Sequence, residues 1–240
     1  MNKPKAIFCW SGGKDSAYCL HKVLSENQFD IAFLLTTVNE EVDRVSMHGV
    51  RSSLLEAQAD AIGLPVVKVM LQEKSNEAYE NAMNKVLMKA KSEGIEHVIF
   101  GDIFLKDLRN YRENNLKKVE MKAVFPLWNM KTDDIVEDFI DKGFKTVICC
   151  VNDEYLGFNW LGRAINHSFL RELPENVDSC GENGEFHSFC FDGPIFKNPI
   201  EFSLGDTVYK PYFQSATEDS SLPENDKKIG FWFIDLILKN

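Results

Sequence analysis

The amino-acid sequence predicts an α/β protein, in which a doubly wound parallel sheet is followed by a smaller α+β domain. Three observations support this prediction. Short apolar runs alternate with helical periodicity between residues 6 and 121, the first apolar run leads directly into a glycine-rich turn, and the regular alternation ends near residue 128. Strands that alternate with helices of this length favour βαβ units and therefore a parallel sheet.

The predicted elements of the first region follow one another in a regular order. Residues 6–10 form a continuous apolar run, which is typical of a buried parallel strand. A helix follows the glycine-rich turn, because apolar residues recur at helical spacing from Ala17 to Leu24. The remaining elements are strands at 31–35, 65–70 and 97–100, and helices at 51–62, 76–92 and 105–121.

The second region is less regular. Thr132 to Asp134 has the composition of an N-cap region for a helix over residues 135–141, and 146–151 is apolar enough for a strand. Short strands are also predicted at 185–191, 200–204 and 230–238, and a polar exposed loop at 215–228. We therefore divide the chain into domains at residues 1–128 and 129–240.

Composition bounds the class of protein. The 240 residues are 44% hydrophobic and 27% charged, as in a soluble globular protein with a buried core. No apolar run approaches the ~20 residues of a membrane span, and the start of the sequence does not resemble a secretory signal. None of the six cysteines forms a C-x-x-C motif, which favours a reduced cytoplasmic protein. The net charge of −10 argues against nucleic acid as a partner, except through a local basic patch.

The turn after the first strand has the features of a phosphate-binding loop. Paired glycines let backbone N–H groups approach a phosphate closely, and the following helix contributes the positive end of its dipole. Two hydroxyls and a lysine add further donors. The residues of this predicted phosphate grip are Ser11, Gly12, Gly13, Lys14, Asp15 and Ser16.

Two other phosphate-binding turns are excluded. The Walker A pattern needs glycine where Phe8 stands and Ser or Thr where Asp15 stands, and the dinucleotide pattern G-x-G-x-x-G is absent. The hexapeptide S-G-G-K-D-S resembles the PP-loop of the N-type ATP pyrophosphatases, which include GMP synthetase, asparagine synthetase and tRNA thiolases. This resemblance implies a fold like that of the adenine nucleotide alpha hydrolases (HUP type). It also implies a loop that holds the pyrophosphate of ATP while a nucleophile attacks the α-phosphorus, and Mg²⁺, with Asp15 and Asp102 as candidate ligands.

A second polar cluster follows Cys180. Glu182, Glu185 and His187 lie in and just after a glycine-rich turn, with Glu185 and His187 on one side of a regular strand. Such a cluster suits acid–base work, ammonium binding or metal ligation. A hairpin with simply solvated carboxylates explains the pattern equally well.

The two motifs together resemble the diphthine–ammonia ligase family. That family pairs an N-terminal S-G-G-K-D-S with a C-terminal G-E-x-G-E-[FY]-[HE]-[ST], which here spans residues 181–188. Segments at 46–48, 100–102 and 161–163 also match. The resemblance implies ATP-dependent amidation of a carboxylate, on a protein side chain or a small molecule, with AMP and pyrophosphate as products. Residue 2 is Asn2 rather than a nucleophilic cysteine, so free ammonium is the simpler nitrogen source.

Within this resemblance each candidate residue receives a role. Gly101 and Asp102 follow a strand at the sheet edge where open α/β sheets bind ligands. The candidate catalytic residues are Lys14, Asp15, Glu182 and Glu185. The candidate nucleotide-binding residues are the loop 11–16 with Thr36, Thr37, Gly101 and Asp102. The candidate substrate-binding residues are His48, Arg109, Arg163 and His187, and Arg112 is considered beside Arg109 as an anion-binding arginine.

Three alternatives remain open at this point. Sulfur transfer to tRNA would need an activated cysteine, for which Cys180 is the candidate. A sensor of the same fold would bind ATP or AMP without turnover. The apolar run 229–234 is expected to pack on the chain's own core, with edge-to-edge pairing in a homodimer as its alternative.

Overall fold

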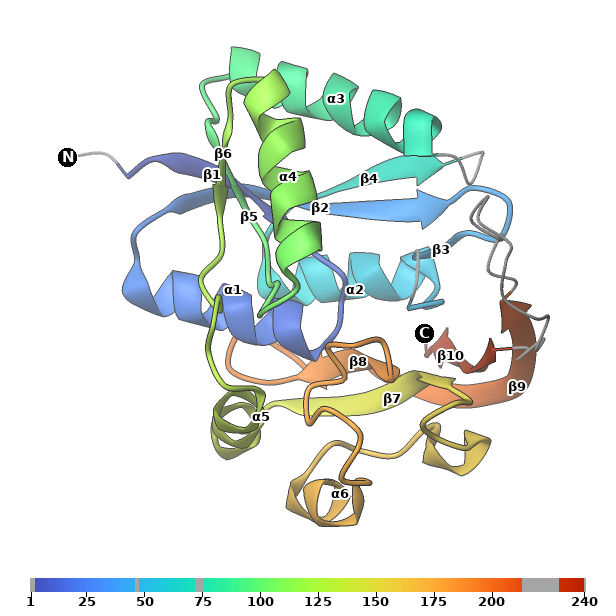
Figure 1. Cartoon of the computed structure of the whole chain (residues 1–240). Helices are drawn as coiled ribbons and strands as arrows, with labels where there is room; N and C mark the ends of the chain where they lie inside the picture. The colour runs from blue at the N-terminus through green and yellow to red at the C-terminus, as the bar shows by residue number, and fades with distance from the viewer. Residues whose placement is uncertain (1–2, 46–47, 72–75, 213–228, 240) are drawn as a thin grey trace, which may run out of the picture.

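Two β-sheets with helices between and around them make up the computed structural model, which describes residues 3–45, 48–71, 76–212 and 229–239 (Figure 1). The first sheet is parallel apart from one short strand, and the second is antiparallel. The parallel strands are β1 (Lys5–Cys9), β2 (Asp30–Asn39), β4 (Val66–Leu71), β5 (His97–Ile99) and β6 (Lys122–Val124), and the short strand is β3 (Arg44–Val45).

The parallel strands are ordered β4-β2-β1-β5-β6, so the chain moves outward from β1 in one direction and then in the other. Helices α1 (Lys14–Glu26) and α2 (Ser52–Ile62) cover one face, and α3 (Asn76–Ser92) and α4 (Lys106–Lys118) cover the other (Figure 1). Ala6 and Phe8 pack into the core under α1 and α2, whereas Ile7 packs into the core under α3 and α4. This alternation confirms the doubly wound parallel sheet.

The second sheet has the order β8-β7-β10-β9 and faces α1 and α2 (Figure 1). Its helix α6 lies on the side away from α1 and α2. The elements of this part are α5 (Thr132–Asp141), β7 (Lys145–Asn152), the 3-10 helix η1 (Phe158–Trp160), α6 (His167–Glu172), β8 (Phe186–Asp192), β9 (Phe202–Tyr212) and β10 (Ile229–Leu238). One hydrophobic core joins this sheet to α1 and α2, so the two sheets are firmly packed together.

The structure adds elements that the sequence did not predict: β3, β6, η1 and α6. All four are short, with too few residues to establish a period. The helix predicted from Ile135 begins earlier, at Thr132, and its N-cap is Lys131, without a side-chain cap bond. The Thr132 hydroxyl instead donates to Asp178 at 2.7 Å. The loop predicted at 215–228 lies outside the described residues.

The C-terminal apolar run forms an interior strand. β10 is hydrogen-bonded to β7 on one side and to β9 on the other. Packing within the chain's own core is therefore confirmed, and pairing of this run between subunits is wrong, because its edges are already occupied. Among the helices of the described residues, none is long and apolar enough to cross a bilayer.

Candidate active site

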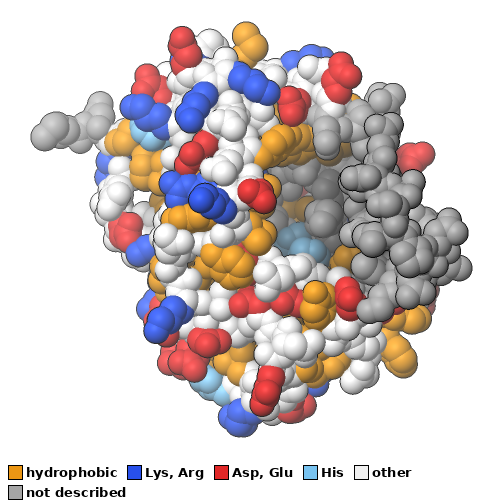
Figure 2. Space-filling view, in the orientation of Figure 1, with side chains coloured by type: hydrophobic (Ala, Val, Ile, Leu, Met, Phe, Trp, Pro, Cys, Tyr) orange, Lys and Arg blue, Asp and Glu red, His pale blue; other side chains and the backbone are white. Residues whose placement is uncertain are grey.

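A cavity of about 630 Å³ opens at the carboxyl ends of β1, β2 and β5. β2 and β4 are added on one side of β1, and β5 and β6 on the other, so the order of strand addition reverses between β1 and β5. Open α/β sheets bind their ligands at such a switch point. The segment from Cys180 to Ser188 forms the opposite border of the cavity, so both sheets contribute to it. The space-filling view shows the surface hollowed here, with a histidine inside (Figure 2).

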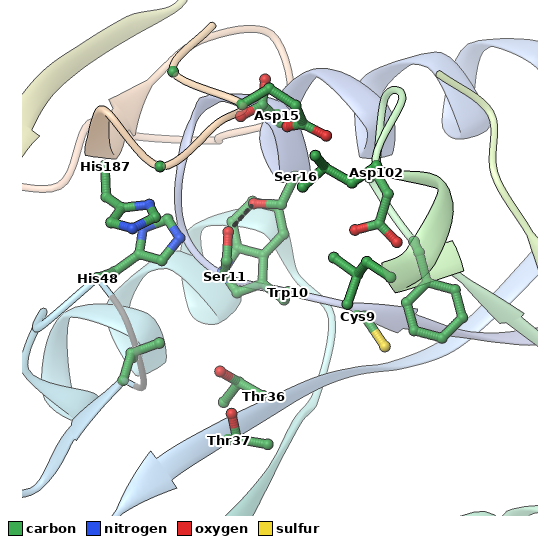
Figure 3. A pocket seen from close by; sticks show the side chains of 18 of the residues that line it. Cys9, Trp10, Ser11, Asp15, Ser16, Thr36, Thr37, His48, Asp102 and His187 are labelled. Carbon is green, nitrogen blue, oxygen red and sulfur yellow. Dashed lines mark hydrogen bonds between the residues drawn. The ribbon is translucent and has the colours of Figure 1, made fainter. Parts of the chain in front are cut away.

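Ser11, Asp15 and Ser16 of the predicted phosphate loop line the cavity, whereas Gly12, Gly13 and Lys14 do not. Ser11 Oγ donates to Ser16 Oγ at 3.2 Å, and the backbone N–H of Gly13 donates to Ser11 Oγ at 3.3 Å (Figure 3). Gly12 has φ +80°, a conformation that favours glycine. Gly13 is the N-cap of α1 without a side-chain cap bond, and the N–H of Lys14 donates to Ser188, so the N–H groups of Asp15 and Ser16 are the ones that an anion could bind.

Strand β8 of the second sheet is hydrogen-bonded to this loop. The N–H of Lys14 donates to the Ser188 hydroxyl at 3.1 Å, and the N–H of Cys190 donates to the Gly12 carbonyl at 2.9 Å. A Cβ on Gly13 would lie 2.7 Å from His48 Cε1 and 3.0 Å from the Ser188 carbonyl, so a larger residue would have to displace the His48 ring and crowd β8. Ser188 was not among the predicted site residues, although its place at the end of the second motif was a signal.

Lys14 is buried at the base of the loop and forms an ion pair with Asp15. Burial alone would lower the pKa of Lys14, but the Asp15 carboxylate outweighs it, and the pKa lies above its ordinary value. Lys14 therefore remains a full cation. The thiol of Cys180 is also close to Lys14 and donates to the Thr132 carbonyl at 3.3 Å. Burial raises the pKa of Cys180 to about 12, so it is a neutral thiol rather than an activated thiolate.

Three carboxylates face one side of the cavity. Asp15 and Asp102 lie near each other there (Figure 3), and Glu182 joins them from the second motif. Glu182 Oε1 accepts the N–H of Ile103 at 2.9 Å. Burial, and secondly the Asp15 carboxylate, raise the pKa of Glu182 to about 7. Burial also raises the pKa of Asp102, and Asp15 adds to the shift despite the ion pair with Arg112 at 2.6 Å.

The donor set fits Mg²⁺ bound together with a nucleotide. Mg²⁺ in such sites is usually held by one or two carboxylates plus phosphate oxygens. Asp15 and Asp102 supply two carboxylates, and a cation between them would offset the Asp15 repulsion that adds to the effect of burial on the pKa of Asp102. Among the described residues no group of three or more His, Cys, Asp or Glu side chains could hold a metal by itself.

Glu185, predicted as catalytic, lies in a different place. Its side chain does not line the cavity and is only 1% exposed. Its carboxylate accepts the N–H of Asp178 at 3.0 Å, the N–H of Asn183 at 2.9 Å and the amide of Asn183 at 3.1 Å. These bonds close the turn that carries Glu182. The geometry therefore supports a positioning role for Glu185 in place of the catalytic role that was predicted.

Two histidines form another wall of the cavity. The rings of His48 and His187 face each other with centroids 4.7 Å apart (Figure 3), and His48 Nδ1 lies 3.2 Å from the Ser188 carbonyl. Burial, and secondly His48, lower the pKa of His187 to about 3, and burial also lowers the pKa of His48. Both rings are therefore neutral near pH 7. Thr36 and Thr37 line the cavity at the end of β2, away from this pair (Figure 3).

The predicted arginines do not reach the cavity, but a neighbour does. Arg109 is paired with Glu113 at 2.8 Å and lies over the Trp128 ring, and Arg163 is paired with Glu172 at 2.6 Å. Neither lines the cavity. Arg112 lines it, held by the ion pair with Asp102 and lying 4.5 Å over the Phe100 ring.

Comparison with known proteins identifies the family of this chain. The family model described as the diphthamide synthase N-terminal domain matches residues 4–123, and the diphthamide synthase C-terminal domain matches residues 131–215. Diphthine–ammonia ligase of Mus musculus is 25% identical over 223 residues, which cover 82% of each chain. Diphthine–ammonia ligase of Homo sapiens is 24% identical over 253 residues, which cover 90% of this chain and 94% of the human protein.

Among solved structures, the U34-tRNA thiolase NcsA from Methanococcus maripaludis, with its 4Fe-4S cluster, is similar over 59% of this chain and 58% of that chain, with a TM-score of 0.37 and 16% identity. The two family models match residues of both sheets, including the phosphate loop and the second motif. The chain therefore belongs to the diphthamide synthase family.

Proposed function

We propose that this chain is a carboxylate–ammonia ligase that converts ATP to AMP and pyrophosphate, and that its acceptor is diphthine, as the names of its relatives suggest. The observation that carries the proposal is the loop from Ser11 to Ser16: its two serine hydroxyls and Asp15 line a cavity that Asp102 and Glu182 also line. The buried Lys14 is paired with Asp15 at this loop, and α1 begins there. A pyrophosphate leaving group is stabilised by a lysine, hydroxyls and a helix N-terminus. Amidation by ammonium needs a base, which one of the carboxylates can provide.

In the proposed reaction the two ends of ATP are held by different elements. The loop and Lys14 bind the β- and γ-phosphates, and Thr36 and Thr37 at the end of β2 flank adenine. Mg²⁺, held by Asp15 and Asp102, would neutralise charge on the phosphates. In this proposal residues 1–128 supply the ATP site and residues 129–240 supply most of the acceptor site, with His48 and His187 at their border.

The chemistry proceeds in two displacements. The acceptor carboxylate attacks the α-phosphorus, the bond to the β-phosphate oxygen breaks, and an acyl adenylate and pyrophosphate form. Ammonia then attacks the acyl carbon, AMP leaves with its bonding electron pair, and the nitrogen releases a second proton to solvent as the amide forms. Glu182 takes the proton that ammonium must lose to become a nucleophile. Glu182 lines the cavity, and its Oε1 accepts the N–H of Ile103, which leaves Oε2 for this proton.

This role for Glu182 predicts a pH dependence. A general base acts in its ionised form, and the pKa of Glu182 is about 7. We expect kcat/KM, expressed for the ammonium ion, to rise as the pH increases through about 7 and then to level off. Glu182→Gln should remove this inflection. An inflection of the same size in Glu182→Gln would show that another group is the base.

Arg112 is proposed to orient the acceptor carboxylate, since guanidinium groups bind carboxylates in a bidentate geometry. Arg112→Lys keeps the charge but not this geometry, so we expect KM for the acceptor to rise about tenfold, the effect of losing roughly 1.4 kcal/mol of binding. Arg109→Lys is the matched control on the same helix, with its side chain outside the cavity. Steady-state kinetics that show equal effects of the two substitutions would refute this role.

The decisive assay measures AMP and pyrophosphate formed from ATP with ammonium and a diphthine-bearing elongation factor. We expect AMP, pyrophosphate and the amide to form in equal amounts, and none of them to form without the acceptor. Release that depends on tRNA instead would favour the sulfur-transfer alternative, although the neutral thiol of Cys180 gives that reading no support. If the protein binds ATP but forms no AMP with any acceptor tested, a nucleotide sensor without turnover would be favoured.

A further inference from the structure

We propose that Gln58 is a positioning residue for the phosphate loop: its side-chain amide fixes the orientation of the Gly12–Gly13 peptide and ties that peptide to β8. The proposal rests on the proposed function, because it concerns how the same loop grips pyrophosphate. Gln58 lies on α2, is 0% exposed and does not line the cavity. It would therefore act on bound phosphate only through the loop.

Three hydrogen bonds determine how the Gln58 amide is oriented. Its Oε1 accepts the indole N–H of Trp10 at 2.9 Å, and its Nε2 donates to the Gly12 carbonyl at 2.9 Å and to the Cys190 carbonyl at 2.6 Å. An indole nitrogen can only donate and a carbonyl can only accept. Rotating the amide by half a turn would therefore break all three bonds, so this buried side chain has one satisfied orientation.

The bond to the Gly12 carbonyl has a consequence inside the cavity. In a planar trans peptide the C=O of one residue and the N–H of the next point in opposite directions. The Gly12 carbonyl is fixed by two donors, Gln58 Nε2 and the N–H of Cys190. The N–H of Gly13 is thereby directed to the other side, toward Ser11 Oγ, which lines the cavity. Gln58 thus aims a loop N–H at the position proposed for phosphate.

Packing around Gly12 adds a steric constraint to these bonds. A Cβ on Gly12 would lie 2.7 Å from Gln58 Oε1 and 2.9 Å from Leu55 Cδ2. The α2 side chains therefore occupy the space beside the glycine and leave the peptide little room to rotate. Because Gln58 also binds the Cys190 carbonyl of β8, the loop and the second sheet share one buried anchor.

The test compares two substitutions that each remove buried hydrogen bonds to β8. Gln58→Met keeps the length of the side chain and removes its three bonds. Thr146→Val is the matched control, because Thr146 is also 0% exposed and donates to the Phe189 carbonyl of β8 at 2.8 Å, away from the loop. Calorimetry would measure the Kd of inorganic pyrophosphate and of ATP, each with Mg²⁺, and thermal unfolding would measure Tm.

We expect both variants to lower Tm, but only Gln58→Met to weaken binding of pyrophosphate and ATP, by about 10- to 100-fold, the cost of misplaced binding groups. If Gln58→Met binds both as the wild type does, Gln58 is merely structural and the inference is wrong. Wild-type protein that binds neither would overturn the proposed function as well, so the two failures are distinguishable.

A measurement on the wild type keeps the inference testable if Gln58→Met does not fold. Because the loop and β8 share the Gln58 anchor, pyrophosphate should slow hydrogen exchange of amides in β8, Cys190 among them, as well as those of the loop. If pyrophosphate slows hydrogen exchange only in the loop and not in β8, Gln58 does not couple the two segments, and the inference is wrong.

Discussion

Replacing Lys14 with methionine is expected to reduce pyrophosphate release from ATP by about 10²- to 10³-fold, the typical cost of removing one preorganised charge from a transition state. Lys14 is the buried cation of the loop, and its side chain is paired with Asp15. Methionine preserves most of its volume, so the fold should persist. The measurement is AMP and pyrophosphate formed in a single turnover, with circular dichroism to check folding.

Two further variants make this result specific. Asp15→Asn should also suppress cleavage, because Asp15 is the partner of Lys14 and a proposed ligand of Mg²⁺. Lys22→Met on the same helix is the control, since Lys22 is paired with Glu26 and does not line the cavity. Wild-type cleavage by a folded Lys14→Met protein would contradict the assignment of the loop.

Glu182→Gln and Glu185→Gln are expected to fail in different ways. Glu182→Gln removes the proposed base, so amide formation should fall by about 10²- to 10⁴-fold while ATP still binds. Glu185→Gln replaces an acceptor of three N–H donors with a group that places its own NH₂ against one of them. Leaving that buried donor unpaired should destabilise the protein by about 1–3 kcal/mol.

The pair is separated by measuring unfolding in urea and amide formation on the same samples. Glu182→Gln should unfold like the wild type and lose the product, whereas Glu185→Gln should unfold at lower urea and retain most of its activity below that range. Loss of product by Glu185→Gln at unchanged stability would restore the catalytic role that the sequence predicted for it.

The sheet and the loop were predictable because local pattern determines both. Apolar runs of strand length alternate with helical periodicity, and the direction of each parallel strand then places the loop and Asp102 at one edge. The order of the second sheet was not predictable in this way. It depends on pairing between residues far apart, such as Phe231 with Asn152.

The details of the site depended on contacts that periodicity does not show. Arg109 and Arg112 lie on one charged helix, and contacts with Phe100 and Asp102, which follow β5, hold Arg112 at the cavity. The bond between the N–H of Lys14 and Ser188 joins positions 174 residues apart. Gln58 left a weaker signal, because it falls on the buried face of α2 with Leu54 and Leu55, where an apolar residue would be expected.

The central claim is that ATP is cleaved between its α- and β-phosphates to drive amidation. It is tested most directly with ATP labelled at the γ-phosphate, ammonium and the diphthine-bearing factor, with the label followed by chromatography and the factor by mass spectrometry. All released label is expected to be pyrophosphate, and each pyrophosphate should accompany one amide. Label released as inorganic phosphate, with ADP as the other product, would contradict it.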